Sequence, residues 1–475
     1  MEIYDSLSRE NKKIAKGKKL KLFVCGPTVY DDAHIGHART YLVFDAFVRY
    51  LRGRGFKVFY LQNITDVDDK TIDRARREKK NPLSIARLFE KRYREDMEKI
   101  GIASVDRYAR ATDFIPEITA QVEALIKKGY AYRATDGYYF DIKKFKDYGK
   151  LSGRTALQAE DAVSRIDESV DKRNKGDFAL WKFSQPGEPA WDTKFGKGRP
   201  GWHIEDTAIS EKFFGPQYDF HGGANELKFP HHEAEIAQQE AASGKKPFVK
   251  VWMHTGVLTI GGKKMSKSLK NFITIRKFLE THPAETLRLA VFKHHYRKPV
   301  DYGEELINQA ETERKYFSEL LKKLELVEKQ SKSKSGGGKI KEFIAEGAKN
   351  FSEALDNDFN TPQALAAIQK LATRLEKKMW LISRSEAKST RIALEKLFKL
   401  VGLSFKDGGI PPRINDILKR RELFRANKQF SKADALRKRI WVLGYEVEDT
   451  PLGPLVLPKN YDQRQNKSSA ARPGS

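Results

Sequence analysis

Two short strings of the sequence combine residue types that bind phosphate groups. The first is His34-Ile35-Gly36-His37 and the second is Lys264-Met265-Ser266-Lys267-Ser268. A glycine between two imidazoles at a helix start lets a phosphate chain approach the backbone, and the imidazoles and free helical N–H groups donate to its oxygens. The lysines, in a loop next to glycines, can stabilise charge that develops on a departing pyrophosphate. Alone, either string could be a helix cap or a solvated loop; together they predict a nucleotide site.

The first string lies in the loop of a predicted strand–helix–strand unit. Residues 20–25 form an apolar run that ends at Gly26-Pro27, residues 38–52 have helical spacing, and residues 58–61 form a second apolar run. Open parallel sheets bind ligands at the carboxyl ends of their strands. We therefore expect the site between residues 25 and 37.

The later segments of the chain differ in pattern. Helical stretches alternate with aromatic strand segments from about residue 116, which predicts an inserted domain before the α/β pattern resumes near residue 198. After about residue 303 the sequence is nearly all helical, with a predicted flexible loop at residues 331–339. The polar, basic segment after residue 461 is typical of a disordered tail.

Composition narrows the classes of function. The chain has 475 residues and a net charge of +26, which predicts a polyanionic partner, nucleic acid first; a lysine-rich proteome from a hot or salty habitat is the alternative. The single cysteine, Cys25, excludes a disulfide framework and a four-cysteine zinc finger, and it favours the cytosol. The sequence has neither a signal-peptide pattern nor a long apolar stretch, so we expect a cytoplasmic protein without a membrane span.

The two strings resemble the signatures of the class I aminoacyl-tRNA synthetases. Further strings narrow the resemblance to the cysteinyl-tRNA synthetase family, and the match covers most of residues 20–460. These strings are Phe23-Val-Cys-Gly-Pro-Thr-Val-Tyr-Asp31, Gln62-Asn-Ile-Thr-Asp-Val-Asp-Asp-Lys70, Gly198-Arg-Pro-Gly-Trp-His-Ile-Glu205, Phe229-Pro-His-His-Glu233, Lys264-Met-Ser-Lys-Ser-Leu-Lys-Asn-Phe272 and Ala354-Leu-Asp-Asn-Asp-Phe-Asn-Thr-Pro362.

The resemblance implies an α/β fold with a Rossmann-like parallel-sheet catalytic domain, which carries an inserted α+β domain. Helical stem-contact, helix-bundle and small C-terminal domains follow. The implied segments are 1–115 (catalytic domain, first half), 116–197 (inserted domain), 198–260 (catalytic domain, second half), 261–310 (signature loop and stem contact), 311–402 (helical bundle), 403–460 (anticodon-binding domain) and 461–475 (disordered basic tail).

The reaction that the resemblance implies has two steps. The carboxylate of L-cysteine attacks the α-phosphate of Mg²⁺·ATP to give an adenylate and pyrophosphate, and a ribose hydroxyl of tRNA then takes the aminoacyl group. His34 and His37 would contact the phosphates, and Lys264 and Lys267 would stabilise the transition state. Thr65 and Trp202 would shape the amino-acid pocket, and the glycine-rich string His221-Gly222-Gly223 would approach the adenosine. The implied substrate-binding residues are Gly26, Thr28, Thr65, Trp202, His221, Gly222 and Gly223.

The resemblance also implies a Zn²⁺ ion that reads the thiolate of the substrate. Family members hold this ion with two cysteines, a histidine and a glutamate, and the matching positions here are Cys25, Asp206, His231 and Glu235. Asp206 stands where the family has a cysteine. Aspartate keeps the charge of a thiolate and can bind zinc, but the harder oxygen weakens the preference for this metal. The departure leaves open whether zinc is bound and whether Glu205 replaces Asp206 as a ligand.

Three functions remain in view at this point. The first is a cysteinyl-tRNA synthetase, for which the family suggests a monomer. The second is a paralogue with altered amino-acid choice, or one that binds tRNA or nucleotide without charging. The third is a ligase that joins cysteine to a small amine. Such ligases lack an anticodon-binding domain, whereas residues 420–451 of this chain resemble one. The sequence therefore favours tRNA as the acceptor.

Overall fold

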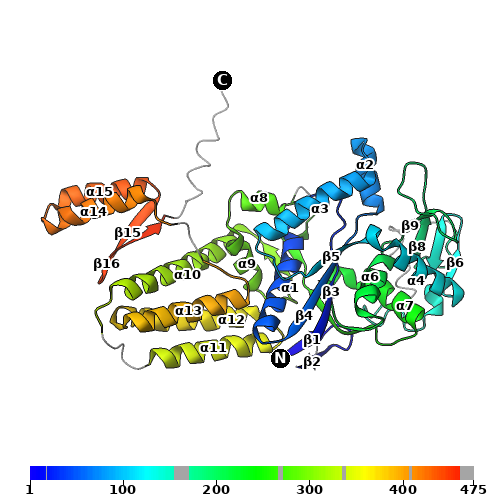
Figure 1. Cartoon of the computed structure of the whole chain (residues 1–475), viewed down its shortest axis with the longest axis horizontal. Coiled ribbons are helices and arrows are strands. Elements are labelled where there is room, and N and C mark those ends of the chain that lie inside the picture. The colour runs from blue at the N-terminus through cyan, green and yellow to red at the C-terminus, as the bar shows by residue number, and fades with distance from the viewer. Residues whose placement is uncertain are drawn as a thin grey trace, which may run out of the picture. The chain divides into compact units, whose positions relative to one another are not determined.

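The protein divides into two compact units. The computed structural model describes residues 1–15, 17, 19–154, 171–265, 271–333, 339–405 and 409–459 (Figure 1). The first unit comprises Met1–Glu311, Lys349–Ala367 and Leu397–Leu403, and the second comprises Thr312–Ala348, Ile368–Lys396 and Ser404–Ser475. Lys267 and the tail predicted at 461–475 lie outside the described residues.

A five-stranded parallel sheet in the order β11-β10-β3-β4-β5 forms the centre of the first unit. Its strands are β3 (Lys19–Val24), β4 (Lys57–Ile64), β5 (Arg107–Arg110), β10 (Tyr218–Ala224) and β11 (Val249–Thr255). The chain leaves β3 toward β4 on one side and returns at β10 on the other, so the strand order reverses beside β3. This is the position at which open α/β sheets bind ligands.

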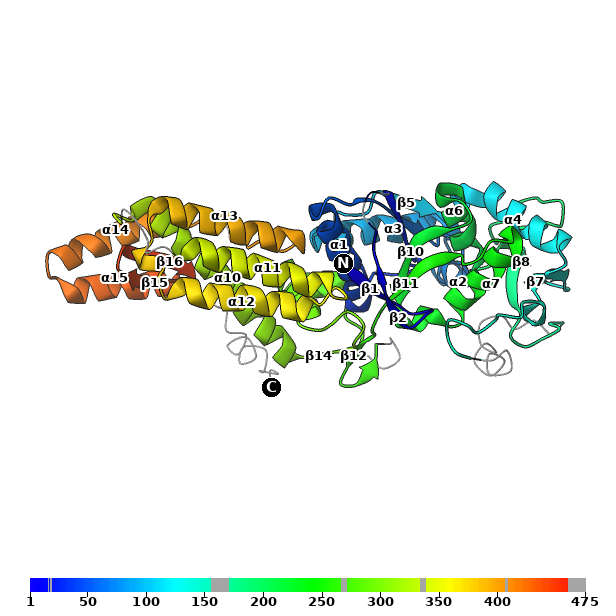
Figure 2. The ribbon, with the colours of Figure 1, turned by 90° about the horizontal axis from the view of Figure 1, so that it is seen from below.

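The strand–helix–strand unit predicted around the first string is confirmed. Helix α1 (Ile35–Gly53) connects β3 to the parallel strand β4. Leu22, Phe23 and Val24 are fully buried, because helices cover both faces of a parallel sheet. Figures 1 and 2 show the sheet between α1 on one side and α6 (Ile204–Phe214) on the other.

A second sheet is formed by residues that lie, in the sequence, between strands β5 and β10 of the parallel sheet. It is four-stranded and antiparallel, in the order β6-β7-β8-β9. Its strands are β6 (Ala131–Arg133), β7 (Gly137–Phe140), β8 (Phe178–Phe183) and β9 (Gly198–Pro200), preceded by α4 (Ile115–Lys127). The helix and the sheet form the α+β arrangement expected of the predicted insertion, although β9 begins after its predicted end at residue 197. The predicted domain bounds stay predictions.

Shorter elements complete the first unit. A three-stranded sheet in the order β13-β12-β14 carries the start of the second string. The remaining elements are β1 (Glu2–Asp5), β2 (Glu10–Lys13), α2 (Asp69–Glu78), α3 (Pro82–Lys99), η1 (Ala111–Phe114), η2 (Ile142–Lys144), η3 (Asn225–Lys228), α7 (His231–Ser243), β12 (Leu258–Ile260), β13 (Lys263–Lys264), α8 (Ile275–Leu279), α9 (Ala284–Phe292) and β14 (Val300–Tyr302).

The second unit is mostly helical. Its helices and strands, four of which also contribute to the first unit, are α10 (Glu304–Gln330), α11 (Ile340–Asp356), α12 (Thr361–Glu376), η4 (Met379–Leu381), α13 (Arg384–Leu400), α14 (Pro412–Ala426), α15 (Phe430–Val442), β15 (Tyr445–Thr450) and β16 (Gly453–Pro458). Ile417, Ile440 and Val456 form a small core between α14, α15 and the antiparallel β15–β16 hairpin. Among the described residues, no helix combines the length and apolar character that crossing a membrane requires.

One buried charge network fixes α1 within the first unit. Asp45 on α1 is fully buried and accepts hydrogen bonds from Arg288 Nη1 and Arg49 Nε, both at 2.8 Å, and from the backbone N–H groups of Ala103 and Ser104, both at 3.0 Å. Burial opposes ionisation of this carboxyl, but the two guanidinium groups and the backbone donors hold the pKa of Asp45 below its usual value.

We expect Asp45→Ala to lower the free energy of unfolding by about 3–5 kcal/mol, because the fully buried Arg288 loses its carboxylate. The matched control is Glu325→Ala, which removes the exposed ion pair with Lys329 (2.6 Å) on α10 and should cost about 0–1 kcal/mol. Urea unfolding followed by circular dichroism measures both. Equal losses in the two variants would contradict this account of α1.

Candidate active site and metal centre

His34 and His37 form the start of α1. His34 is the N-cap, and its Nδ1 accepts from the backbone N–H groups of Gly36 (3.1 Å) and His37 (3.3 Å). In return, His37 Nδ1 accepts from the backbone N–H of His34 at 3.3 Å. The two rings stack with centroids 3.8 Å apart. The sequence predicted that the N–H groups at the start of this helix would be free to bind phosphate. In the structure they are instead capped by imidazole nitrogens of the same string.

The protonation of these imidazoles follows from their surroundings. Burial, aided by the charge of Lys264, lowers the pKa of His34 to about 4. Burial and the charge of His34 place the pKa of His37 well below its usual value. Both rings are neutral at pH 7, and because each Nδ1 accepts a hydrogen bond, each Nε2 carries the proton. The two Nε2–H groups can therefore donate to phosphate oxygens.

The second string begins beside the first. A Cβ atom on Gly36 would lie 2.9 Å from the methyl carbon of Met265 and 2.9 Å from the His34 ring, so Met265 packs directly against the start of α1. The chain after the string returns to the same loop, where the backbone N–H of Ile35 donates to the carbonyl of Ile273 at 3.1 Å. Lys264 is exposed and forms an ion pair with Glu226. The structure thus brings His34, His37 and Lys264 to one place.

The loop after β3 lies against the end of β4. A Cβ atom on Gly26 would lie 1.7 Å from the carbonyl oxygen of Asn63, which requires a glycine at this close approach. Thr28 pairs with Thr65 across an isolated β-bridge. The Thr65 hydroxyl donates to Glu205, so the predicted pocket residue is held by a buried carboxylate.

The predicted glycine-rich string lies on β10. A Cβ on Gly222 would lie 2.3 Å from the Phe44 ring, and one on Gly223 would lie 2.8 Å from the His232 ring, so neither position has room for a side chain. The ring of His221 is fully buried and lies against Cys25. Its approach to an adenosine stays a prediction.

The four predicted metal ligands converge. One donor atom from each of Cys25, Asp206, His231 and Glu235 lies within 4.8 Å of the others, and all four residues are buried. His231 Nε2 is 3.1 Å from Asp206 Oδ2 and 3.1 Å from Glu235 Oε1. Cys25 comes from the end of β3, Asp206 from α6, and the other two from one face of α7. These donors could hold a metal ion.

Neighbouring side chains hold the His231 ring. Trp202 stacks on it with centroids 4.3 Å apart, and His203 Nδ1 lies 2.7 Å from His231 Nδ1. Asn63 Nδ2 donates to Asp206 Oδ1 at 2.5 Å. Trp202 is half-buried and the other residues are buried, so the tryptophan forms the solvent side of this cluster.

The same cluster concentrates acidic groups away from water. Burial, with the charges of Glu235 and Asp206, raises the pKa of the Cys25 thiol well above its usual value. Burial and the Asp206 charge also raise the pKa values of Glu205 and Glu235 strongly. A bound cation would reverse these shifts, because it favours the ionised form of each ligand.

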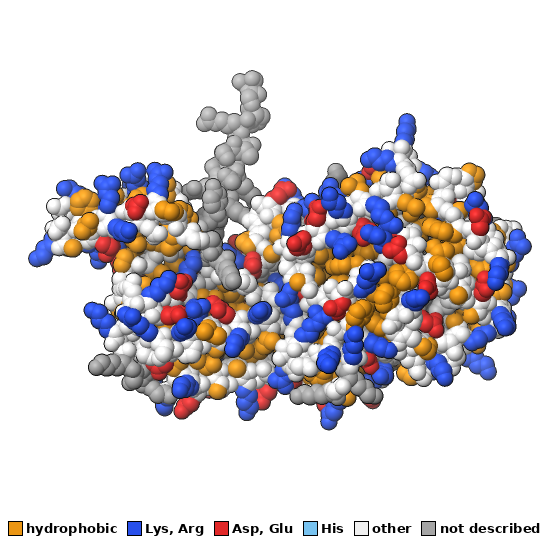
Figure 3. Space-filling view, viewed as in Figure 1, with side chains coloured by type: hydrophobic (Ala, Val, Ile, Leu, Met, Phe, Trp, Pro, Cys, Tyr) orange, Lys and Arg blue, Asp and Glu red, His pale blue; other side chains and the backbone are white. Residues whose placement is uncertain are grey.

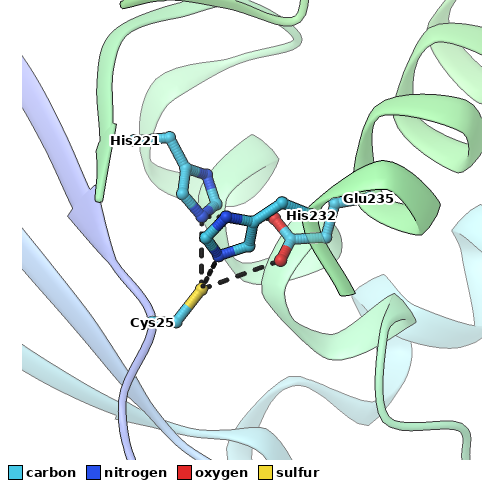
Figure 4. A group of neighbouring side chains, drawn as sticks. All are labelled: Cys25, His221, His232 and Glu235. Carbon is cyan, nitrogen blue, oxygen red and sulfur yellow. Dashed lines mark hydrogen bonds and ion pairs between the residues drawn. The ribbon is translucent and has the colours of Figure 1, made fainter. Parts of the chain in front are cut away.

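Sequence reasoning did not assign several residues that the structure places here. A second group of donor atoms within 4.8 Å of one another comprises Cys25, His221, His232 and Glu235 (Figure 4). His232, His203 and Asn63 stand inside the strings quoted above, so the strings contained them, but nothing in their spacing shows which side chains face Cys25. Glu226, the ion-pair partner of Lys264, is a further residue to which the sequence assigned no role.

Comparison with known families covers nearly the whole chain. Residues 11–312 match the family of class I tRNA synthetase (C) catalytic domains. Residues 350–406 match the DALR domain, and residues 407–453 match the cysteinyl-tRNA ligase anticodon-binding domain.

Relatives and solved structures agree with these matches. The cysteine–tRNA ligase of Thermococcus gammatolerans is 40% identical over 95% of this chain and 98% of its own, and that of Methanococcus maripaludis (strain S2 / LL) is 39% identical over 97% and 99%. The methionyl-tRNA synthetase of Mycobacterium tuberculosis, solved with methionyl-adenylate, shares the fold at a TM-score of 0.61 and 16% identity, over 81% of this chain and 90% of its own. The Agrobacterium radiobacter K84 LeuRS complex also gives 0.61, at 12% identity over 97% and 93%. This chain belongs to the cysteine–tRNA ligase family of class I aminoacyl-tRNA synthetases.

Proposed function

We propose that this protein joins L-cysteine to tRNA in two steps, with cysteinyl-adenylate as the intermediate and with release of pyrophosphate and AMP. The observation that carries the proposal is the meeting of two chemistries at the carboxyl end of β3: phosphate-binding side chains at the start of α1, and a buried cluster around Cys25. Full-length relatives with 39–40% identity are cysteine–tRNA ligases, which supports the same reaction.

At the phosphate end, neutral imidazoles and lysines have different roles. The Nε2–H groups of His34 and His37 donate to oxygens of Mg²⁺·ATP, and the positive N-terminal end of the α1 dipole adds to this attraction. Lys264 leaves Glu226 and, with Lys267, neutralises charge on the departing pyrophosphate. No covalent enzyme intermediate is needed, because the carboxylate of cysteine itself attacks the α-phosphate.

At the amino-acid end, the buried donors fit a zinc ion. Cys25, Asp206, His231 and Glu235 would hold it: all four residues are buried, and His231 Nε2 lies 3.1 Å from both Asp206 Oδ2 and Glu235 Oε1. When bound, zinc supplies a Lewis acid that prefers sulfur to a hydroxyl, which separates cysteine from serine. Thr65 and Trp202 orient the substrate beside it.

The second unit carries the proposed contacts with tRNA. Figure 3 shows Lys and Arg side chains gathered along α14 and α15, which lie in the segment that matches the anticodon-binding domain. The exposed cations there include Lys419, Arg420, Arg425, Lys432, Lys438 and Arg439. Cations of this kind bind an RNA backbone with strong salt dependence. We place the enzyme in the cytoplasm and expect it to act as a monomer.

The proposal predicts that cysteine drives exchange of labelled pyrophosphate into ATP in the presence of zinc, and that cysteine appears on tRNA when tRNA is added. Serine and alanine should support exchange at least about 100-fold less well, because a hydroxyl or methyl group cannot replace a thiolate on zinc. If cysteine gives no exchange while another amino acid does, the protein is a paralogue that activates a different amino acid. The aspartate at position 206, in place of the family's cysteine, would then be the reason.

Lys264→Met should lower kcat for exchange about 100-fold with little change in KM for ATP, because the lysine acts on charge that develops in the transition state. Lys263→Met is the matched control. Lys263 is the adjacent exposed lysine of the same strand β13, and neighbouring side chains of a strand point in opposite directions. Equal losses in both variants would refute a specific role for Lys264.

Asp206→Cys should make zinc loss to a chelator slower by at least about 10-fold. Residues that only orient the ligands of a zinc site already change its affinity by about 10-fold or more, and a ligand should matter at least as much. The physical reason is the softer sulfur donor beside Cys25. Metal content measured during dialysis against the chelator, with L-cysteine and ATP present so that the substrate-bound state is tested, gives the result. Unchanged zinc retention would count against Asp206 as a ligand position.

A further inference from the structure

Cys25 and Glu235 also belong to the second group of donors, whose other members are His221 and His232 (Figure 4). Cys25 Sγ lies 3.2 Å from His221 Nε2, 3.1 Å from His232 Nε2 and 3.7 Å from Glu235 Oε1. His221 Nε2 lies 3.4 Å from Glu235 Oε2. Ligand bonds of about 2.0–2.3 Å around a tetrahedral zinc ion separate the donor atoms by about 3.3–3.6 Å. The distances from Cys25 Sγ to the two imidazole nitrogens are therefore close to those between zinc ligands, and the Glu235 carboxyl group lies beside them, with Oε1 facing Cys25 and Oε2 facing His221.

The two imidazoles are oriented as metal-binding histidines are. His221 Nδ1 lies 2.6 Å from the Tyr218 hydroxyl, and His232 Nδ1 lies 2.8 Å from His254 Nε2. His254 Nδ1 is in turn 2.9 Å from Ser6 Oγ. Each ring thus has its Nδ1 engaged and its Nε2 aimed at Cys25. A hydrogen-bond partner on the second nitrogen is the usual device that fixes a ligating histidine.

This group lies deeper than the one that contains Asp206. The His221 ring stacks on Trp252, with centroids 4.4 Å apart, and both residues are fully buried. His231, in contrast, stacks on the half-buried Trp202. Glu235 Oε2, which lacks a hydrogen-bond partner among the described residues, is the oxygen that faces His221.

The donor set of the deeper group suits a divalent cation. Its ligands are one thiolate, one carboxylate and two neutral imidazoles, which together balance the charge of the ion. In the other group, Asp206 Oδ1 already accepts a hydrogen bond from Asn63 Nδ2 at 2.5 Å. Imidazole nitrogen suits zinc better than a second carboxylate oxygen does.

We propose that Cys25, His221, His232 and Glu235 form a second cation site, which zinc or cobalt occupies when no cysteine is bound. The site shares two ligands with the Asp206–His231 group, so the two sites cannot be filled independently. This inference does not rest on the proposed function, because it concerns the free protein.

Cobalt titration of the metal-free protein tests the proposal in the absence of ATP, cysteine and tRNA. Cys25 is the only cysteine of the chain, so a sulfur-to-cobalt charge-transfer band reports this one ligand. We expect His221→Gln and His232→Gln to weaken cobalt binding by at least about 10-fold. Asp206→Asn and His231→Gln should bind cobalt as the unmodified protein does. The matched control is His203→Gln, a buried histidine outside both groups, which should also leave the band unchanged.

The opposite pattern would overturn the proposal: cobalt binding retained in His221→Gln and His232→Gln, or weakened as much in Asp206→Asn and His231→Gln. Circular dichroism checks that each variant folds. X-ray absorption of the zinc-loaded, unmodified protein needs no variant. Two imidazole ligands support the deeper site and one imidazole excludes it. Cysteine-dependent exchange, measured separately, shows whether the proposed function fails instead.

Discussion

The close approach of two backbones at the end of β3 is the constraint on which the site depends. Gly26 lies so near the carbonyl of Asn63 that no side chain fits, and the preceding Cys25 donates its backbone N–H to Gly222 on β10 at 3.0 Å. These contacts join β3 to β4 on one side and to β10 on the other, at the point where the strand order of the sheet reverses. They place the only thiol of the chain within reach of α7 on one side and lead the next residues into α1 on the other.

Burial then determines the chemistry of every ionisable group around that point. A thiol and the carboxyl groups of Glu205, Asp206 and Glu235 share a space from which water is excluded. The pKa values of Cys25, Glu205 and Glu235 rise because burial and neighbouring negative charge disfavour ionisation. Such a cluster can be relieved by protons or by a cation, and a cation relieves several groups at once. The packing of acids therefore argues for a metal more strongly than any single ligand does.

Local patterns in the sequence predicted the elements that depend on local interactions. The strand at 20–25, the helix after His34 and the parallel strand near residue 58 follow from apolar periodicity and from the glycines that flank them. The side-chain partners did not follow, because they join distant segments. Lys264 pairs with Glu226, and Thr65 with Glu205, across segments that only the folded sheet brings together. For the same reason the strings contained His232 without showing that it faces Cys25.

The histidines illustrate how one side chain acquires two roles in a single site. At the start of α1, His34 Nδ1 accepts from backbone N–H groups, so the proton lies on Nε2, the nitrogen that we propose donates to phosphate. On β10, His221 Nδ1 faces the Tyr218 hydroxyl. A proton on this Nδ1 leaves a lone pair on Nε2, directed at Cys25 and suited to a metal. Both rings are uncharged at neutral pH because burial lowers their pKa values. The partner of Nδ1, more than the identity of the residue, therefore separates the proposed nucleotide-binding histidines from the proposed metal-binding ones.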